Sequence, residues 1–213
     1  MKHIYVAVVV PATVLIPIGI ALVKKNYKHK CLKVIFLYLI FGGLSDVAER
    51  LLGIRHINNL PLLHFYTIIE FLFILRFFQL ALKNPLASRL IGWLMIIFPV
   101  FGIFDFVFIQ SIYQFNSYPR PIAALIIIGL CLFYFFKYSE AEKKNPWVNE
   151  PLNWMVTGIL VYFGSSLFHF AFLNVLYENA SLTVYFIFEI IHATLVMVMY
   201  LLFAAGFLYA KNE

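Results

Sequence analysis

Long apolar stretches, separated by short polar segments, run along the whole chain of 213 residues. Each stretch approaches the roughly 20 residues that a helix needs to cross a hydrocarbon core of about 30 Å. Seven stretches can be delimited, at residues 4–23, 32–53, 60–82, 90–109, 121–137, 152–174 and 182–209. The pattern predicts an all-α, polytopic membrane protein, a bundle of seven transmembrane helices in a single domain covering residues 1–213.

The amino-acid composition excludes other classes of protein. Hydrophobic residues make up 63% of the chain and charged residues 12%, whereas soluble domains contain about 25% charged residues. The sequence contains neither a phosphate-binding loop nor a dinucleotide fingerprint. The net charge of +6 follows from basic residues near the ends of the spans, so no nucleic-acid partner is expected. We expect a multi-pass protein of the cell membrane, which in bacteria is the inner membrane.

The basic residues also predict the orientation in the membrane. When the segments between spans are assigned alternately to the two sides, four basic residues fall on one side and twelve on the other. The first side holds Lys2, Arg50, Arg55 and Arg120, and the second holds Lys24, Lys25, Lys28, Lys30, Lys33, Arg76, Lys83, Arg89, Lys137, Lys143, Lys144 and Lys211. Because cytoplasmic segments carry the excess of Lys and Arg, the N-terminus is predicted outside and the C-terminus in the cytoplasm.

Within the spans, every carboxylate and histidine falls in the half nearer the predicted outer surface. The segment "NNLPLLHFYTIIEF" shows this best, because it opens with an Asn-Pro helix start and then carries His64 and Glu70 into an apolar run. Ionisable groups at such depth cost several kcal/mol unless they face one another or a wet cavity. We therefore predict a polar pocket that opens outward. Its predicted residues are Ser45, Asp46, Glu49, Asn58, His64, Tyr66, Glu70, Asp105, Arg120, Tyr185, Glu189 and His192.

Helical spacing supports a shared pocket, since polar residues form one stripe on each of three spans. The stripes contain Tyr38, Ser45 and Glu49; Asn59, Tyr66 and Glu70; and Tyr185, Glu189, His192 and Tyr200. Arg120 lies in the turn "FNSYPRP", where it could close the rim or bind an anionic group. The alternatives are interfacial ion pairs or caps for Asp46 and Glu49, and an interhelical hydrogen-bond network for the deeper residues.

A metal site is a further hypothesis. Glu189 and His192 are three residues apart on one helix, so both side chains can point at one ion, and His64 or His169 would complete the set. A carboxylate with two imidazoles suits zinc or iron. A serine-based site from Ser45, His64 and Asp46 is another arrangement, although no motif surrounds it.

Two resemblances add to this interpretation. The segments "NNLPLLHFYTIIEF", "FNSYPR", "LVYFGSSLFHF" and "EIIHATLVMVMYLLFAAGF" resemble a family of uncharacterised small seven-helix membrane proteins of Bacteroidota. The chain is more distantly similar to the alkaline ceramidase and progestin receptor superfamily of intramembrane hydrolases. That likeness implies a zinc site made by Ser, Asp and His. In that superfamily the last helix carries a His-x-x-x-His pair, where this chain has only His192.

Three functions are compatible with these features. The first is a small-molecule or lipid binding and sensing module, which would contact membrane lipid and act through a cytoplasmic or membrane signalling partner. The second is an intramembrane, metal-dependent lipid hydrolase. The third is a small transporter, which would need polar groups in both halves of the bundle, whereas the half nearer the cytoplasm contains only Arg76.

Overall fold

The computed structural model of the protein describes residues 4–140 and 146–210. In that part of the chain, seven helices are long and apolar enough to cross a membrane, which confirms the predicted all-α bundle. They are Tyr5–Lys24, Lys30–Ile54, Leu60–Ala81, Pro85–Ile109, Pro119–Lys137, Pro151–Asn179 and Leu182–Tyr209. Of the basic residues that predict the orientation, Lys2, Lys143, Lys144 and Lys211 lie outside the described residues.

Six spans contain one long helix each. These helices are α4 (Lys30–Ile54), α5 (Leu60–Ala81), α6 (Pro85–Phe104), α7 (Pro119–Glu140), α8 (Pro151–Asn179) and α9 (Leu182–Tyr209). Helix α6 begins five residues before its predicted start at residue 90, because the Asn84 side chain accepts a hydrogen bond from the Ala87 backbone N–H and caps it. Helix α8 continues five residues past its predicted end at residue 174, because Asn174 and Glu178 do not interrupt it.

The first span is broken into pieces. A π-helical turn η1 (Tyr5–Val9) leads into α2 (Val10–Ala12), and α3 (Leu15–Lys24) follows after a gap at Thr13 and Val14. Pro11 and Pro17 explain the break, because proline has no backbone N–H to donate to the preceding turn. The Thr13 hydroxyl donates to the Val10 carbonyl at 2.5 Å, which satisfies part of the interrupted backbone inside the membrane.

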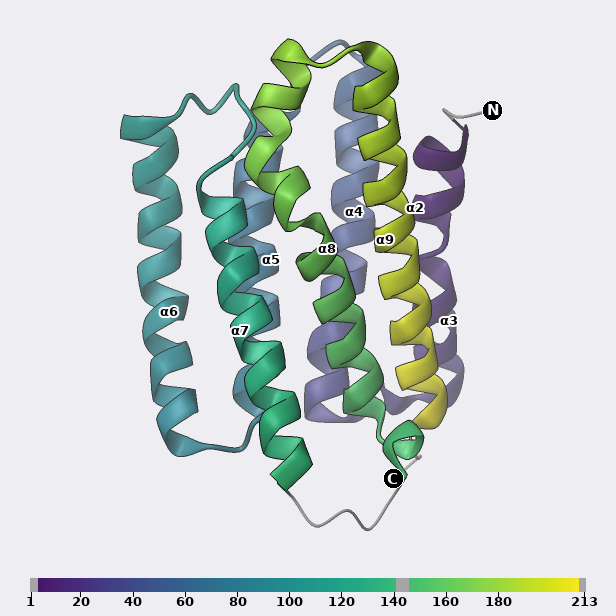
Figure 1. Cartoon of the computed structure of the whole chain (residues 1–213). Coiled ribbons are helices and arrows are strands. Elements are labelled where there is room, and N and C mark those ends of the chain that lie inside the picture. Colours follow the sequence, from purple (N-terminus) through teal and green to yellow (C-terminus); the bar gives the residue numbers. More distant parts are fainter. Residues whose placement is uncertain (1–3, 141–145, 211–213) are drawn as a thin grey trace.

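The helices form a flattened bundle. Figure 1 shows α7, α8 and α9 in front, α4 and α5 behind, α6 at one edge and the first span at the other. Helix α8 packs along α7 and α9, α4 along α5, and the first span mainly along α9, while α6 packs on α5. The chain termini lie at opposite ends of the bundle (Figure 1), as an odd number of crossings requires. We call the end nearer the N-terminus the N-terminal end.

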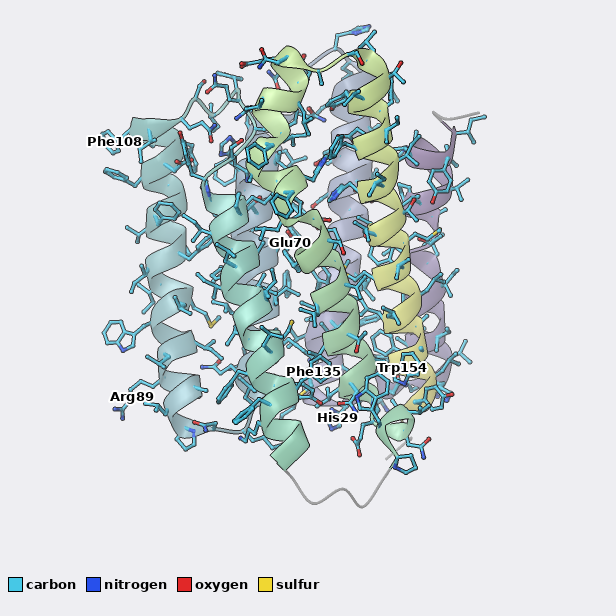
Figure 2. All side chains as sticks on the ribbon, in the orientation of Figure 1. His29, Glu70, Arg89, Phe108, Phe135 and Trp154 are labelled. Atoms are coloured by element: carbon cyan, nitrogen blue, oxygen red, sulfur yellow. The ribbon has the colours of Figure 1, made fainter. Side chains whose placement is uncertain are left out.

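Large side chains fill the middle of the bundle and the half away from the N-terminal end. The largest fully buried residues include Phe71, Phe77, Phe78, Phe163, Phe203 and Phe207. Here α8 and α9 approach closely, since a Cβ atom on Gly206 would lie 2.7 Å from Met155 Cε. Figure 2 shows His29 and Arg89 at this far end and Glu70 well inside the bundle. Most of the buried polar side chains lie in the other half, where a cavity is found.

Candidate functional site

A cavity of about 490 Å³ lies in the half of the bundle nearer the N-terminal end. We call it the polar cavity. Its walls come from the first span, α4, α5, α7, α8, α9 and the segment before α7, and none of the lining residues belongs to α6. The polar and charged side chains in its wall are Tyr38, Asp46, Glu49, Arg50, Asn59, Tyr66, Arg120, Tyr162, His169, Tyr185, Glu189, His192 and Tyr200.

Arg120, in the first turn of α7, is the central cation of this wall. It is buried, and its guanidinium donates a hydrogen bond from Nη2 to the Tyr162 hydroxyl at 3.3 Å. Its Cζ atom lies 4.5 Å from the centroid of the Phe170 ring and 5.8 Å from that of Tyr66. These contacts occupy the faces of the guanidinium and one edge. Its Nε atom is buried and has no hydrogen-bond partner in the part of the chain that the structure describes.

Glu70, on α5, explains why an apolar helix carries a deep carboxylate. It is buried and lies behind the cavity wall. Its Oε1 atom accepts hydrogen bonds from the hydroxyls of Tyr38 at 2.9 Å and Tyr66 at 3.1 Å, and its Oε2 atom lies 3.9 Å from Arg120 Nη2. The carboxylate is therefore well partnered, whereas the 3.9 Å separation is longer than a hydrogen bond. Glu70 therefore balances the charge of Arg120 without accepting a hydrogen bond from it.

A second polar cluster joins α8 and α9 beside Arg120. The His169 and His192 rings stack with centroids 4.4 Å apart and planes within 11° of parallel. His192 Nδ1 lies 3.0 Å from the Ser166 hydroxyl, and His169 Nε2 lies 3.7 Å from Glu189 Oε1. Tyr185 lines the cavity one helical turn before Glu189 on α9. Because Ser166 and His169, and likewise Glu189 and His192, are three residues apart, each pair occupies one face of its helix.

This cluster does not gather around a metal ion. In residues 4–140 and 146–210, no group of three or more His, Cys, Asp or Glu side chains is placed to hold one. Imidazole lone pairs lie in the ring plane, so the nearly parallel His169 and His192 rings do not direct them at a common point. His64, the other imidazole of the predicted set, bonds elsewhere, with its Nε2 atom 2.9 Å from the Gln114 carbonyl oxygen.

The segment between α6 and α7 determines where Arg120 lies, and His64 helps to hold it. Asn116 donates a hydrogen bond to the Thr67 hydroxyl at 2.6 Å. The Asn174 side chain pairs with both backbone groups of Phe115, at 3.1 and 2.9 Å. These bonds connect the segment to α5 and α8, so Arg120 enters the bundle at a fixed point. The role of His64 in this structure is to position that segment.

The predicted pocket residues fall into two groups. Those that line the polar cavity are Asp46, Glu49, Tyr66, Arg120, Tyr185, Glu189 and His192. The others are Ser45, Asn58, His64, Glu70 and Asp105, which do not line it. Ser45 is buried, whereas Asn58 is exposed and its side chain accepts a hydrogen bond from the Leu60 backbone N–H at 2.9 Å. The Asn58 side chain therefore binds the first backbone N–H of α5, just before the N-cap residue Asn59. The proposed grouping of Ser45 with His64 and Asp46 does not appear in the cavity wall.

Asp105 occupies an unusual position. It is fully buried where α6 passes into a π-helical turn, η3 (Asp105–Ile109). Both of its carboxylate oxygens lack a hydrogen-bond partner among the described residues. His64 is nearby, since its ring lies 5.7 Å from that of Phe106, the residue after Asp105. Asp105 thus belongs to the neighbourhood of His64, away from the polar cavity.

Helix α8 supplies residues that the sequence analysis did not single out. Tyr162 and Phe170 line the cavity beside Arg120, and Ser166 contacts His192 from behind the wall. Tyr162, Ser166 and His169 follow one another at intervals of four and three residues, which places them on one helical face. That spacing, together with His169, was the available signal for a fourth polar stripe.

Comparison of the chain with family models, curated proteins and solved structures finds no match. The resemblances described above therefore stay predictions, and the function has to be argued from the site. Chemically, the site offers a buried guanidinium with unused donors, a ring of tyrosine hydroxyls and two stacked imidazoles. These groups can bind and orient an oxygen-rich group inside a largely apolar enclosure.

Proposed function

We propose that this protein is a membrane-embedded binding and sensing module for a small amphipathic molecule that carries an oxyanion, a carboxylate or a phosphate. Arg120 binds the oxyanion and the apolar wall of the polar cavity holds the rest of the molecule. The observation that carries the proposal is the buried Arg120 in the wall of the polar cavity, whose Nε donor has no acceptor among the described residues.

Arginine has five N–H donors in a planar fork that matches the oxygens of carboxylates and phosphates. Among the described residues, the bond to Tyr162 is the one that uses a donor of Arg120 at hydrogen-bond distance, and Glu70 lies farther away. Leaving a buried donor unsatisfied costs about 1–3 kcal/mol, more for a charged group, so a ligand oxygen would recover a substantial free energy. The Nδ1 atom of His169 is likewise buried and has no hydrogen-bond partner among the described residues.

The size and lining of the cavity support a small ligand. Its volume of about 490 Å³ lies within the roughly 300–1,000 Å³ of typical small-molecule sites, which are mainly apolar with a few placed polar groups. Leu60, Leu63, Leu173 and Val196 provide apolar wall between the polar groups. A molecule with one charged group and an apolar body matches this distribution.

The acidic side chains in the wall lie close to basic ones, which argues against a cationic ligand. Asp46 and Glu49 line the wall together with Arg50, within four residues of it on α4. The Oε1 atom of Glu189 lies 3.7 Å from His169 Nε2. Among the described residues, the Nε donor of Arg120 lacks a partner, so the wall favours an anionic group.

We infer that a membrane or cytoplasmic partner detects ligand binding through the helices that surround the cavity.

Thermal unfolding of the purified protein in detergent tests this proposal. Octanoate, octylamine and octanol share one chain and differ in the head group. Octanoate should raise the Tm of the wild-type protein in proportion to the logarithm of its concentration, while octylamine and octanol should have little effect. The increase should disappear in Arg120→Gln and be retained in Arg89→Gln, which removes an exposed arginine at the far end.

If Arg120→Gln folds poorly, Arg120→Lys keeps the positive charge and removes the Nε donor and the planar fork, and it should weaken the octanoate response. Equal stabilisation by all three compounds, or stronger stabilisation by octylamine, would overturn the proposal. Native mass spectrometry of the same sample should show a retained acidic lipid in the wild-type protein that Arg120→Gln lacks.

Lipid hydrolysis is a second candidate, favoured by the 3.0 Å contact between the Ser166 hydroxyl and His192 Nδ1, a nucleophile and base at hydrogen-bond distance. Ser166 is fully buried and does not line the polar cavity. A substrate would have to reach Ser166 through the wall formed by Tyr162 and His192. Binding is the better supported function.

A further inference from the structure

A second cavity, of about 440 Å³, lies between the first span and α4. We call it the lateral groove. Most of its lining is apolar, with Val8, Ala12, Val14, Leu15, Ile18, Ile40, Leu44 and Val47 among its residues. Leu15 and Leu44 are each 65% exposed, so the groove faces the surroundings of the bundle. In a membrane those surroundings are the acyl chains of lipids.

The lateral groove and the polar cavity share four wall residues: Ala7, Pro11, Asp46 and Arg50. The two spaces are thus neighbours, and we call the four shared residues, two on the first span and two on α4, the seam. The seam lies toward the N-terminal end, because Ala7 begins the first span and Arg50 is near the end of α4. From Ala7 to Ile18 the groove runs about 16 Å along the helix axis, toward the middle of the membrane.

At the seam, the first span packs against α4 less extensively than it packs against α9. Tyr5 and Lys24, near the two ends of that span, bond Thr194 and the Leu208 carbonyl, both on α9. No side chain of the described first span hydrogen-bonds to α4, and the two segments touch much less than the first span and α9 do. The π-helical turn and the proline break also lie beside the seam, and such irregular turns often occur at functional sites.

We propose that the seam is a lateral entrance from the bilayer, and that the ligand is a single-chain lipid with a carboxylate or phosphate head. Its head passes between Pro11 and Arg50 to reach Arg120, and its chain lies in the lateral groove. This inference rests on the proposed function. The lipid enters in the orientation that it has in a leaflet, with the head near the surface and the chain toward the midplane. Arg50 lies on this route, next to Asp46.

Selectivity must come mainly from the head, because an acyl chain gains little by leaving other acyl chains for an apolar groove. The test must therefore separate a bound lipid from one that merely surrounds the protein. A suitable probe is palmitic acid with a diazirine in the middle of its chain, added to the protein in nanodiscs of neutral lipid. After irradiation, the labelled residues are located by mass spectrometry of peptides.

Labelling should concentrate on the groove-lining residues of the first span and α4. Unlabelled palmitic acid should compete, whereas hexadecylamine should not. Comparing hexadecyl phosphate with palmitic acid as competitors distinguishes a phosphate head from a carboxylate head. The compound with the preferred head should compete at the lower concentration. Arg120→Gln should reduce the competable labelling roughly tenfold or more, because a hydrogen bond to a charged group is lost. Groove labelling that no competitor reduces and that persists in Arg120→Gln would mean surrounding lipid only, and would overturn the inference.

Gly43 allows the groove to be blocked without touching the polar cavity. A Cβ atom there meets only Val14 Cγ1, at 3.7 Å, so Gly43→Leu extends into the groove without a backbone clash. It should abolish groove labelling while octanoate, which has a short chain, still raises the Tm. Gly92→Leu on α6, where a Cβ atom meets nothing within 4 Å, is the matched control and should label as the wild type does.

These results distinguish the two proposals. If octanoate stabilises the protein through Arg120 but the groove is not labelled, the lateral entrance is wrong and the proposed function stands. If octanoate has no effect that depends on Arg120, the proposed function is wrong and the inference is wrong with it. Unchanged labelling in Gly43→Leu would also overturn the lateral entrance, because the chain would then lie elsewhere.

Discussion

The Nη2 atom of Arg120 lies 3.9 Å from the Oε2 atom of Glu70, and both side chains are buried between α5 and α7. The two side chains differ in how many hydrogen-bond partners they have. Glu70 accepts two tyrosine hydroxyls, whereas Arg120 keeps a buried donor without an acceptor among the described residues. Glu70 therefore balances the charge of the guanidinium, and the guanidinium keeps a donor that can bind an oxyanion.

This pairing predicts strong coupling between the two residues. Glu70→Gln keeps the shape of the side chain but leaves the Arg120 charge uncompensated, and breaking a buried pair from one side costs about 3–5 kcal/mol. Replacing both residues, as Glu70→Gln with Arg120→Met, removes both charges. The double variant should lose less Tm than the two single variants together. Thermal unfolding in one detergent measures all four proteins, and strictly additive losses would show that the pair is not coupled.

The Glu70 environment also shows what the sequence could predict. The seven spans followed from apolar length, and helical spacing placed Tyr66 on the cavity side of α5 and Glu189 and His192 on the cavity side of α9. The same spacing could not tell that Glu70 lies behind the wall, because that depends on the hydroxyls of Tyr38 and Tyr66 reaching over it. Nor could it tell that Arg120, assigned to a turn, becomes buried.

The burial of Arg120 depends on bonds between distant segments. Asn116 bonds Thr67 on α5, and Asn174 on α8 bonds Phe115. Sequence periodicity describes one helix at a time, so it contains no information on such contacts. The expected metal ligands show the same limit, since spacing makes Glu189 and His192 neighbours but does not fix how the His169 ring stacks on His192.

Asp105 should be replaceable with a gain in stability. Its carboxylate is fully buried and has no hydrogen-bond partner among the described residues. A buried group of this kind costs several kcal/mol when it is charged. Asp105→Asn removes the charge at nearly constant volume, so its Tm should exceed that of the wild type. Asp46→Asn is the control, because Asp46 is only partly buried and lines the polar cavity beside Arg50, so it should gain little. A lower Tm for Asp105→Asn would indicate a partner for the carboxylate that the fold does not reveal.

Ser166 should not react with a fluorophosphonate, a reagent for activated serines. Its hydroxyl lies beside His192 Nδ1, but the residue is fully buried and outside the cavity wall. Intact-mass measurement of the wild-type protein should therefore show no adduct that Ser166→Ala lacks. Ser166→Ala should also have a lower Tm, because His192 Nδ1 would lose its partner, at a cost of about 1–3 kcal/mol. An adduct specific to Ser166 would favour the hydrolase function.

The orientation in the membrane is open to a direct test. Asn179, at the end of α8, and Lys28, between the first span and α4, are both exposed and lie at opposite ends of the bundle. The positive-inside rule places Asn179 outside, so Asn179→Cys should react with an impermeant thiol reagent in intact cells and Lys28→Cys should not. Asn145, the loop position otherwise suited to the cytoplasmic side, lies outside the described residues.

The native cysteines do not disturb this measurement, since Cys31 and Cys131 are both buried. Permeabilised cells should label both variants and so provide the positive control. The reverse labelling pattern in intact cells would show that the protein has the opposite orientation in the membrane. The polar cavity would then lie in the cytoplasmic half.

The packing of α8 against α9 should be most sensitive at Gly206. An added Cβ atom would lie 2.7 Å from Met155 Cε and 3.0 Å from the Pro151 carbonyl oxygen. The methionine end can move, but the backbone oxygen cannot move without shifting the start of α8. Gly206→Ala should therefore destabilise the protein by about 1–3 kcal/mol, as overpacking of a close-packed interior generally does. Thermal unfolding in detergent is the measurement.

Gly164→Ala is the matched control, because it makes the same change on α8 at a position where a Cβ atom meets nothing within 4 Å. Alanine is the better helix former by roughly 0.5–1 kcal/mol, so this variant should be neutral or slightly more stable. If Gly206→Ala were equally harmless, the start of α8 would have to be free to move away from α9. The wall that α8 contributes to the polar cavity, with Tyr162 and His169, would then not be held rigidly against the stripe of Glu189 and His192.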